Sequence, residues 1–283
     1  MRILLFLLIS NFHLSGYDLD HPKYELIQKA LVEEHNFSAE EIKLIIGQAE
    51  KQQKIIDSMN SPAEFTWTWD RYRKLFIEPK RIKNGKLFIK KNLQTLERAE
   101  AQFGVPKEVI TAILGVETRY GKIMGSYRVL DALSTLSFDY PRRSNFFSQE
   151  LINLLLLARE NNLDIFKLKG SYAGAMGYGQ FIPSSYRAYA VDFDNDGSVD
   201  LLNSVEDAIG SIANYLFQHG WKSNYPIIWE VNNSFEGFNS DSVNNVRKKV
   251  NFDRKTMSPK NATDLNFEGL NTDVLLLSYE TDK

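Results

Sequence analysis

The sequence Ile113-Leu114-Gly115-Val116-Glu117-Thr118-Arg119-Tyr120-Gly121 contains a glutamate at the end of an apolar helical pattern. Pro106 suits the first turn of a helix, and apolar residues recur at helical spacing after it. Glu117 follows Ile113 by four residues and Leu114 by three, so it is predicted to continue the apolar face. The glycine that closes the stretch is typical of a helix end.

A glutamate on a buried helical face is chemically useful because it loses solvation. Desolvation disfavours the charged form, so we predict that the pKa of Glu117 is raised. A carboxyl group that holds its proton near neutral pH can act as a general acid. The alternative is structural: Glu117 would pair with Arg119 or Arg128, and such ion pairs also perturb carboxylates.

The composition of the chain limits its functions. Its 283 residues are 43% hydrophobic, which supports a packed core in one large domain or two to three small ones. The formal net charge of -2 gives no indication of a nucleic-acid partner. The absence of cysteine excludes disulfides, thiolate catalysis and thiolate zinc sites. The four histidines lack metal-ligand spacing, so a histidine-based zinc site is not expected.

The N-terminus resembles a secretory signal over residues 1–16. Met1-Arg2 gives a positive start, Ile3–Ile9 is a short apolar run, and cleavage is expected at Ser15-Gly16. The run is shorter than the roughly 20 apolar residues of a membrane span. Without cysteine, a lipid-modified N-terminal cysteine is excluded. We therefore expect a secreted, soluble protein with no membrane span; the alternative is a buried N-terminal helix.

Most of the remaining pattern is helical. Residues 22–59, 92–160 and 205–218 carry apolar residues at helical spacing. Ser38 begins a sequence that resembles a capping box, which predicts the start of a helix there.

Three other segments differ from this pattern. Residues 62–78 are rich in aromatic residues, which we interpret as part of a core. Residues 80–91 carry five lysines and an arginine, which we interpret as a solvated face that could also meet an anionic polymer. Residues 226–231 are predicted to form a strand of a small β-containing unit.

A glycine-rich stretch occupies residues 170–183 and reads Gly-Ser-Tyr-Ala-Gly-Ala-Met-Gly-Tyr-Gly-Gln-Phe-Ile-Pro. Its four glycines allow the backbone to lie close to another surface. Its polar and aromatic side chains can hydrogen-bond to and stack on a sugar, and include Ser171, Tyr172, Tyr178 and Gln180. The glycine spacing does not match a phosphate-binding loop. The alternative is tight helix packing with no ligand.

An aspartate-rich stretch over residues 192–200 has the pattern of a calcium-binding loop. Aspartates occupy positions 1, 3 and 5, Gly197 position 6, and an apolar residue position 8. Position 12 departs from the pattern, because Asn203 replaces the bidentate glutamate. The candidate ligands are therefore Asp192, Asp194, Asp196 and Ser198, with Glu206 or Asp207 completing the site. We expect a structural rather than a sensing role for calcium; the alternative is a turn without metal.

Five ordered motifs together resemble the lytic murein transglycosylase B family, and the resemblance runs from about Trp69 to Trp221. The motifs are Gly115–Gly121, Phe138–Arg143, Gly170–Pro183, the calcium-like loop and Asp207–Tyr215. The family usually also has a Tyr-Asn-containing helical segment that returns to the cleft, and residues up to Lys283 contain no match to it.

The resemblance implies an α+β fold that is predominantly helical. A lysozyme-like core with the calcium-like loop is expected over residues 105–224. It would be flanked by an N-terminal helical region over 17–104 and a small β-containing unit over 225–283.

The resemblance also implies the roles of individual residues. Glu117 matches the catalytic acid/base, Ser171 and Gln180 match cleft residues, and Tyr120 and Tyr178 are expected to line the cleft. No catalytic cofactor is implied. The expected partner is the glycan strand of peptidoglycan, and a soluble periplasmic monomer is expected.

In this family the glutamate protonates the glycosidic oxygen, and the N-acetyl group of the muramic acid stabilises the oxocarbenium-like centre. Glu117 would then deprotonate the 6-hydroxyl of the same sugar, which closes a 1,6-anhydro ring. Three alternatives stay open: a muramidase that uses water, a non-catalytic, calcium-stabilised peptidoglycan-binding module, and a calcium sensor.

Overall fold

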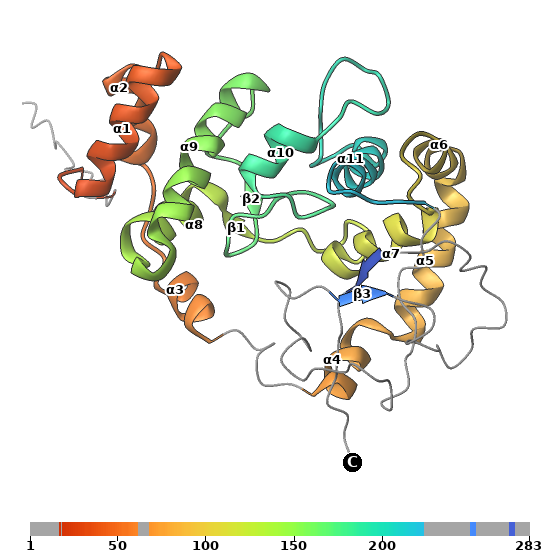
Figure 1. The fold of residues 1–283 in the computed structure, drawn as a ribbon. Helices are drawn as coiled ribbons and strands as arrows, with labels where there is room; N and C mark the ends of the chain where they lie inside the picture. The colour runs from red at the N-terminus through yellow and green to blue at the C-terminus, as the bar shows by residue number, and fades with distance from the viewer. Residues whose placement is uncertain (1–16, 18, 62–67, 224–249, 253–271, 275–283) are drawn as a thin grey trace, which may run out of the picture. The chain divides into compact units, whose positions relative to one another are not determined.

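The chain is mainly helical in a computed structural model that describes residues 17, 19–61, 68–223, 250–252 and 272–274 (Figure 1). It divides into two compact units. The first unit consists of Met1–Pro62 and Pro79–Trp221, and the second of Ala63–Glu78 and Lys222–Lys283.

Helices make up most of the first unit. In its described part they are α1 (Pro22–His35), α2 (Ala39–Ile46), α3 (Gln53–Asn60), α5 (Pro79–Lys91), α6 (Leu93–Phe103), α7 (Lys107–Thr118), α8 (Val129–Asp139), α9 (Ser144–Glu160), α10 (Pro183–Tyr189) and α11 (Val205–Gln218). A 3-10 turn, η2 (Pro141–Arg143), links α8 to α9. The short strands β1 (Tyr127–Arg128) and β2 (Lys169–Gly170) pair antiparallel, with Tyr127 opposite Gly170.

Local sequence signals explain where several helices begin. Pro22 is the first residue of α1, as expected from its fixed φ. At the start of α2, Ser38 Oγ accepts a hydrogen bond of 3.1 Å from the backbone N–H of Glu41, so the predicted cap is confirmed. The helices expected over 22–59 and 205–218 are confirmed by α1 to α3 and by α11.

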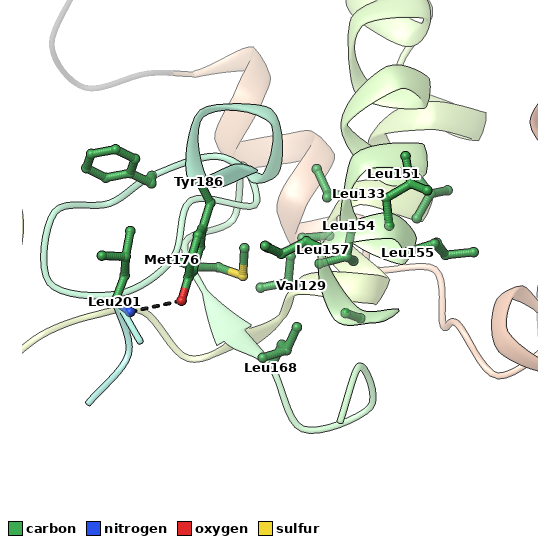
Figure 2. Packing of buried hydrophobic residues seen from close by; sticks show 14 of the residues in the cluster. Val129, Leu133, Leu151, Leu154, Leu155, Leu157, Leu168, Met176, Tyr186 and Leu201 are labelled. Carbon is green, nitrogen blue, oxygen red and sulfur yellow. Dashed lines mark hydrogen bonds between the residues drawn. The ribbon is translucent and has the colours of Figure 1, made fainter. Parts of the chain in front are cut away.

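The core of the first unit is one cluster of buried side chains that extends from α1 to α11. Leucines of α8 and α9 meet near its centre, and Figure 2 shows Met176 of the glycine-rich segment pointing toward them. Met176 is fully buried. The backbone N–H of Leu201 donates a hydrogen bond of 2.9 Å to the hydroxyl of Tyr186, which fixes α10 against the loop before α11 (Figure 2).

Hydrogen bonds attach the N-terminal helices to α8. The carboxylate of Asp131 accepts a bond of 2.8 Å from the backbone N–H of Glu50, and Thr135 Oγ1 accepts one of 3.0 Å from that of Gln52. These bonds satisfy backbone groups between α2 and α3 that would otherwise be left without partners. The domain division expected at residues 104 and 224 stays a prediction.

The second unit contains one described helix and one described strand pair. The helix α4 (Trp69–Phe76) begins after Thr68, whose hydroxyl accepts a bond from the backbone N–H of Arg71. The strands β3 (Val250–Phe252) and β4 (Thr272–Val274) pair antiparallel, which agrees with the β content expected there. The expected signal peptide and the strand expected over 226–231 lie outside the described residues.

Candidate active site

Glu117 lies in the last turn of α7 and is exposed to solvent, so the prediction of a buried position is wrong. Ile110, Ile113 and Glu117 lie along nearly one line of the helix. Ile110 is fully buried, Ile113 is half-buried and Glu117 is exposed. The spacing therefore identified the correct face, but the core covers only the N-terminal part of that face.

A sharp turn follows the helix. Arg119 has a φ of 51° and Tyr120 a φ of 63°, left-handed values that cost non-glycine residues about 1 kcal/mol or more each. The backbone N–H of Tyr120 donates to the carbonyl of Leu114 at 2.9 Å and so satisfies an acceptor at the end of α7. The turn stops the helix directly after Thr118, which leaves Glu117 in its last turn.

Thr118 connects this turn to the glycine-rich segment. Its buried hydroxyl donates to the carbonyl of Tyr178 at 2.8 Å and accepts from the backbone N–H of Gly121 at 2.9 Å. Gly121 has a φ of 81°, and a Cβ there would lie 1.9 Å from the Tyr178 ring. The residue after Glu117 thus holds the end of α7 and the glycine-rich segment in close contact.

Tyr120, which was expected to line the cleft, is half-buried between α5 and α7. Its hydroxyl donates to the carbonyl of Arg81 at 2.9 Å, and its ring stacks on Phe88 with centroids 5.5 Å apart. Added Cβ atoms at Gly85 and Gly115 would lie 2.7 Å and 2.6 Å from the hydroxyl oxygen. Burial raises the pKa of the Tyr120 hydroxyl, and the charge of Arg81 opposes the shift. The described contacts of this side chain are therefore structural.

Two predicted cleft residues, Ser171 and Gln180, shape the glycine-rich segment itself. Ser171 Oγ accepts hydrogen bonds from the backbone N–H groups of Ala173 and Ala175, at 3.2 Å and 3.1 Å. Gln180 Nε2 donates to the carbonyls of Gly177 and Met124, at 2.9 Å and 3.2 Å. The segment thus lies against the loop that follows α7.

Both side chains are half-buried and keep hydrogen-bonding capacity for a ligand. Within the described part of the chain, the hydroxyl proton of Ser171 has no acceptor, and the side-chain oxygen of Gln180 has no donor. Tyr178 is also half-buried and contacts the turn after α7. The structure therefore brings Ser171, Tyr178 and Gln180 together in one segment that packs beside the end of α7.

The calcium-like loop brings three of its predicted ligands together. Carboxylate oxygens of Asp192, Asp194 and Asp196 lie within 4.8 Å of one another. Gly197 has a φ of 91°, and its backbone N–H donates to Asp192 at 2.9 Å. The backbone N–H of Ser198 donates to Asp196 at 2.8 Å. This donor set of clustered carboxylates in a tight turn fits calcium, which prefers oxygen ligands.

Asp207, one of two candidates to complete the site, has another role. It is buried, and its carboxylate accepts backbone hydrogen bonds from Phe193 and Asp200, both at 2.7 Å, and from Asp194 at 3.3 Å. Burial raises the pKa of Asp207, while these hydrogen bonds oppose the shift. Among the described residues, the carboxylate cluster contains neither Asp207 nor Glu206. Asp207 thus holds the loop backbone in place from the first turn of α11.

A protein-family model described as "Transglycosylase SLT domain" matches residues 20–280. The chain belongs to the transglycosylase SLT domain family. Membrane-bound lytic murein transglycosylase B of Escherichia coli (strain K12) is 45% identical over 217 residues. These residues are 74% of this chain and 60% of that protein, so the chain spans less than two thirds of this curated relative.

Solved structures match the chain as well. Escherichia coli lytic transglycosylase Slt35, solved in complex with calcium, is 39% identical with a TM-score of 0.79, over 93% of this chain and 82% of that one. SltB3 of Pseudomonas aeruginosa, solved in complex with NAG-anhNAM-pentapeptide, is 31% identical with a TM-score of 0.67, over 74% of this chain and 55% of that one. The predicted family and the predominantly helical, lysozyme-like fold class are confirmed.

In this transglycosylase SLT domain, sequence reasoning missed two structural residues beside the candidate site. Thr118 was quoted next to Glu117 but was given no role, because its partner Tyr178 lies 60 positions away. Gly115 was not singled out either, although a glycine inside a helix often marks a close approach by another group. That signal would have pointed to the Tyr120 hydroxyl.

Proposed function

We propose that this chain is a lytic transglycosylase that cleaves the MurNAc-GlcNAc β-1,4 bond of peptidoglycan and forms 1,6-anhydromuramoyl products. The observation that carries the proposal is the position of Glu117, exposed in the last turn of α7 beside a glycine-rich segment. Membership of the transglycosylase SLT domain family supports it. A solved relative holds NAG-anhNAM-pentapeptide, which is a fragment with an anhydromuramoyl group.

Glu117 is proposed to act as acid and then as base. Its carboxyl group donates a proton to the glycosidic oxygen as the bond to the anomeric carbon breaks. The N-acetyl oxygen of the same muramic residue stabilises the positive anomeric carbon. The carboxylate of Glu117 then takes the proton of the 6-hydroxyl, whose oxygen bonds to the anomeric carbon. Glu117 is therefore protonated again at the end of the cycle, and no water is consumed.

The neighbouring sequence supports an intramolecular nucleophile. Most glycosidases use two carboxylates, roughly 5–5.5 Å apart when they retain and roughly 6.5–9.5 Å apart when they invert. Residues 118–128 and 168–184, which pack together beyond Glu117, contain no aspartate or glutamate. Asp139 accepts a hydrogen bond of 2.8 Å from the Tyr17 hydroxyl and pairs with Lys51. The 6-hydroxyl of the sugar, held near its target, has a large effective concentration.

The glycine-rich segment is proposed to bind the sugar residues. Ser171 would donate its free hydroxyl proton, and the side-chain oxygen of Gln180 would accept a hydrogen bond. Tyr178 would contribute a partly exposed ring for stacking. Tyr120 is proposed to contribute mainly by fixing the turn after Glu117.

Calcium is proposed to have a structural role in this chain. Asp192, Asp194 and Asp196 would hold the ion together with oxygens of the same loop, Ser198 among them. Glu206 could complete the site only by moving into the carboxylate cluster. The ion would neutralise three adjacent carboxylates and stabilise the loop that leads into α11. No catalytic cofactor is proposed.

We propose that the chain acts in the periplasm as a soluble monomer. The expected signal peptide would direct its export to this compartment, where it would bind the glycan strands. The described residues contain no helix that is both long and apolar enough to span a bilayer.

The direct test is digestion of purified cell-wall sacculi, followed by mass analysis of the released muropeptides. The proposal predicts muropeptides that end in 1,6-anhydromuramic acid. Reducing muramic ends would assign the chain to the water-using muramidases. Binding to sacculi with no released product would assign it to the non-catalytic peptidoglycan-binding modules.

A further inference from the structure

The helix α5 carries a row of lysines that the proposed chemistry does not use. Its 13 residues include no aspartate or glutamate and contain five lysines, all of them exposed: Lys80, Lys83, Lys86, Lys90 and Lys91. Spacing of three or four residues places Lys80, Lys83, Lys86 and Lys90 on one side of the helix, and Lys91 follows Lys90 directly at the edge of that side. The row extends for about 16 Å along the helix axis, at 1.5 Å per residue.

The opposite side of α5 is fixed against the rest of the first unit. Arg81 and Gly85 are buried there, and Phe88 stacks on Tyr120. The carbonyl of Arg81 accepts the hydrogen bond of the Tyr120 hydroxyl. The lysine row is therefore attached to a rigid support, and α5 contacts the turn that follows Glu117.

The row has no internal counter-charge. In the described part of the chain, none of the five lysine side chains forms a hydrogen bond or an ion pair. Other cations of the same unit are paired, for example Arg187 with Glu160 and Arg159 with Glu41. Five unpaired lysines close together repel one another, which is a local cost in a chain whose net charge is -2. An anionic partner would remove this cost.

We propose that the lysine row of α5 binds a carboxylate-bearing polymer, namely the peptide stems of the glycan strand whose sugars occupy the candidate active site. This inference rests on the proposed function and adds a second contact for the same substrate. A pentapeptide stem, such as the one in the SltB3 complex, ends in a carboxylate. A linear polymer repeats this charge along its length, as the lysines repeat along α5.

The same observations favour a polymer over a lipid surface. A helix that lies in a membrane interface needs an apolar face to insert into the lipid. The apolar side of α5 is occupied by packing against α7. Its two exposed large apolar residues, Ile82 and Leu87, lie roughly 140° apart around the helix axis and so form no single apolar face. Binding by α5 would therefore be mainly electrostatic and sensitive to salt.

The test is co-sedimentation with purified sacculi in a Glu117→Gln background, so that the polymer is not degraded. The test variant is Lys83→Gln/Lys86→Gln/Lys90→Gln. The matched control is Lys29→Gln/Lys43→Gln/Lys54→Gln, which removes the same charge from exposed positions of α1, α2 and α3. Melting temperatures check that all variants fold.

At low salt, the α5 variant should bind intact sacculi about tenfold more weakly than the control, because three exposed charge pairs are lost. The difference should shrink at about 0.3 M salt. It should also vanish on sacculi whose carboxyl groups have been converted to neutral amides with a carbodiimide. Equal binding of the two variants to intact sacculi would overturn the proposal.

A second arm uses vesicles of phosphatidylcholine and phosphatidylglycerol. If these vesicles bind through the α5 lysines while sacculi do not, the partner is a membrane surface and the polymer proposal is overturned. Because binding is measured without turnover, failure of the transglycosylase assignment would appear in the product analysis and would leave this result interpretable.

Discussion

Glu117 is positioned by its neighbours more than by its own burial. The left-handed pair Arg119 and Tyr120 ends α7, and Thr118 ties that end to the carbonyl of Tyr178. The carboxyl group therefore projects from a fixed point while remaining open to solvent. This arrangement suits a group that must meet a polymeric substrate from outside.

Replacing Glu117 with glutamine should abolish glycan cleavage and leave stability nearly unchanged. The amide keeps the shape of the side chain but cannot donate the proton. General acid–base catalysis contributes about 10²–10⁴-fold, and one residue serves both steps here. Because Glu117 is exposed, the free energy of unfolding should change by no more than about 0.5 kcal/mol. Near-normal turnover of the variant on sacculi would refute the assignment.

Thr118→Val should lower both stability and turnover. Valine removes the hydroxyl that bonds Tyr178 and Gly121, which leaves half-buried backbone groups without these partners and costs about 1 kcal/mol or more, up to the roughly 3 kcal/mol of a fully buried group. The end of α7 would then be free to move relative to the glycine-rich segment. Thr118→Ser is the matched control, since it keeps the hydroxyl and should keep most of kcat. Equal kcat for the valine and serine variants would contradict the positioning role.

Sequence reasoning at this scale succeeded in part. The helical pattern identified Glu117 as an unusual residue on the correct helix face. Its exposure could not be predicted, because spacing specifies a face and not how far along that face the core extends. The contact of Thr118 with Tyr178 could not be predicted either, because it joins two segments that only the fold brings together.

At the scale of elements, hydrogen bonds to Asp207 of α11 hold the backbone of the aspartate-rich loop in place. Asp207 accepts three backbone hydrogen bonds from residues within the loop, and Asp192, Asp194 and Asp196 project from it. The three clustered carboxylates repel one another when they are ionised. A cation that neutralises them would therefore stabilise the loop.

Calcium should raise the melting temperature without being required for the chemistry. A single site at a hundredfold excess over its dissociation constant stabilises by about 2.7 kcal/mol. Asp194→Asn should reduce this effect, because it removes one negative ligand. Thermal unfolding with calcium and with chelator measures the effect. An unchanged melting temperature would refute calcium binding. Strict dependence of activity on calcium in a folded apo protein would refute the structural role.

The pairing of α9 with α10 gives a test by pH. Arg187 donates two hydrogen bonds to Glu160, of 2.8 Å and 2.7 Å, and these bonds hold the pKa of Glu160 below its ordinary value. Stability from this pair is therefore present above the ordinary glutamate pKa and is lost as pH falls through the lowered pKa. Because Glu160 is 46% exposed, solvent screening limits the contribution to about 1 kcal/mol or less.

Denaturant unfolding of Glu160→Gln and of the unchanged chain at two pH values provides the measurement. The variant should be slightly less stable at neutral pH, and its difference from the unchanged chain should shrink as pH falls below the ordinary glutamate pKa of about 4.3. A destabilisation that stays constant, or that grows as pH falls, would show that the carboxylate charge is not responsible.

Elements with local signals were predictable, and those set by long-range packing were not. Ser38 marked a helix start because its capping effect acts within one turn. The aspartate spacing predicted the clustered carboxylates for the same reason. The role of Asp207 depends on its burial against a loop that precedes it in sequence, and no local pattern reports such burial.

At the scale of the whole molecule, one core supports both the candidate active site and the aspartate-rich loop. Buried residues from α1 to α11 form a single cluster, and Met176 extends the glycine-rich segment into it. The fold thus fixes the segment that would bind the sugar and the helix that carries Glu117. The reacting oxygen, by contrast, is proposed to come from the substrate.

Digestion of sacculi in oxygen-18 water identifies the source of the reacting oxygen. If the 6-hydroxyl of the muramic residue attacks its own anomeric carbon, the products carry a 1,6-anhydro ring and incorporate no heavy oxygen. Mass analysis of the released muropeptides reads out both features in one experiment. We expect unlabelled anhydromuramoyl ends. Heavy oxygen at a new muramic reducing end would show that water is the nucleophile and would contradict this expectation.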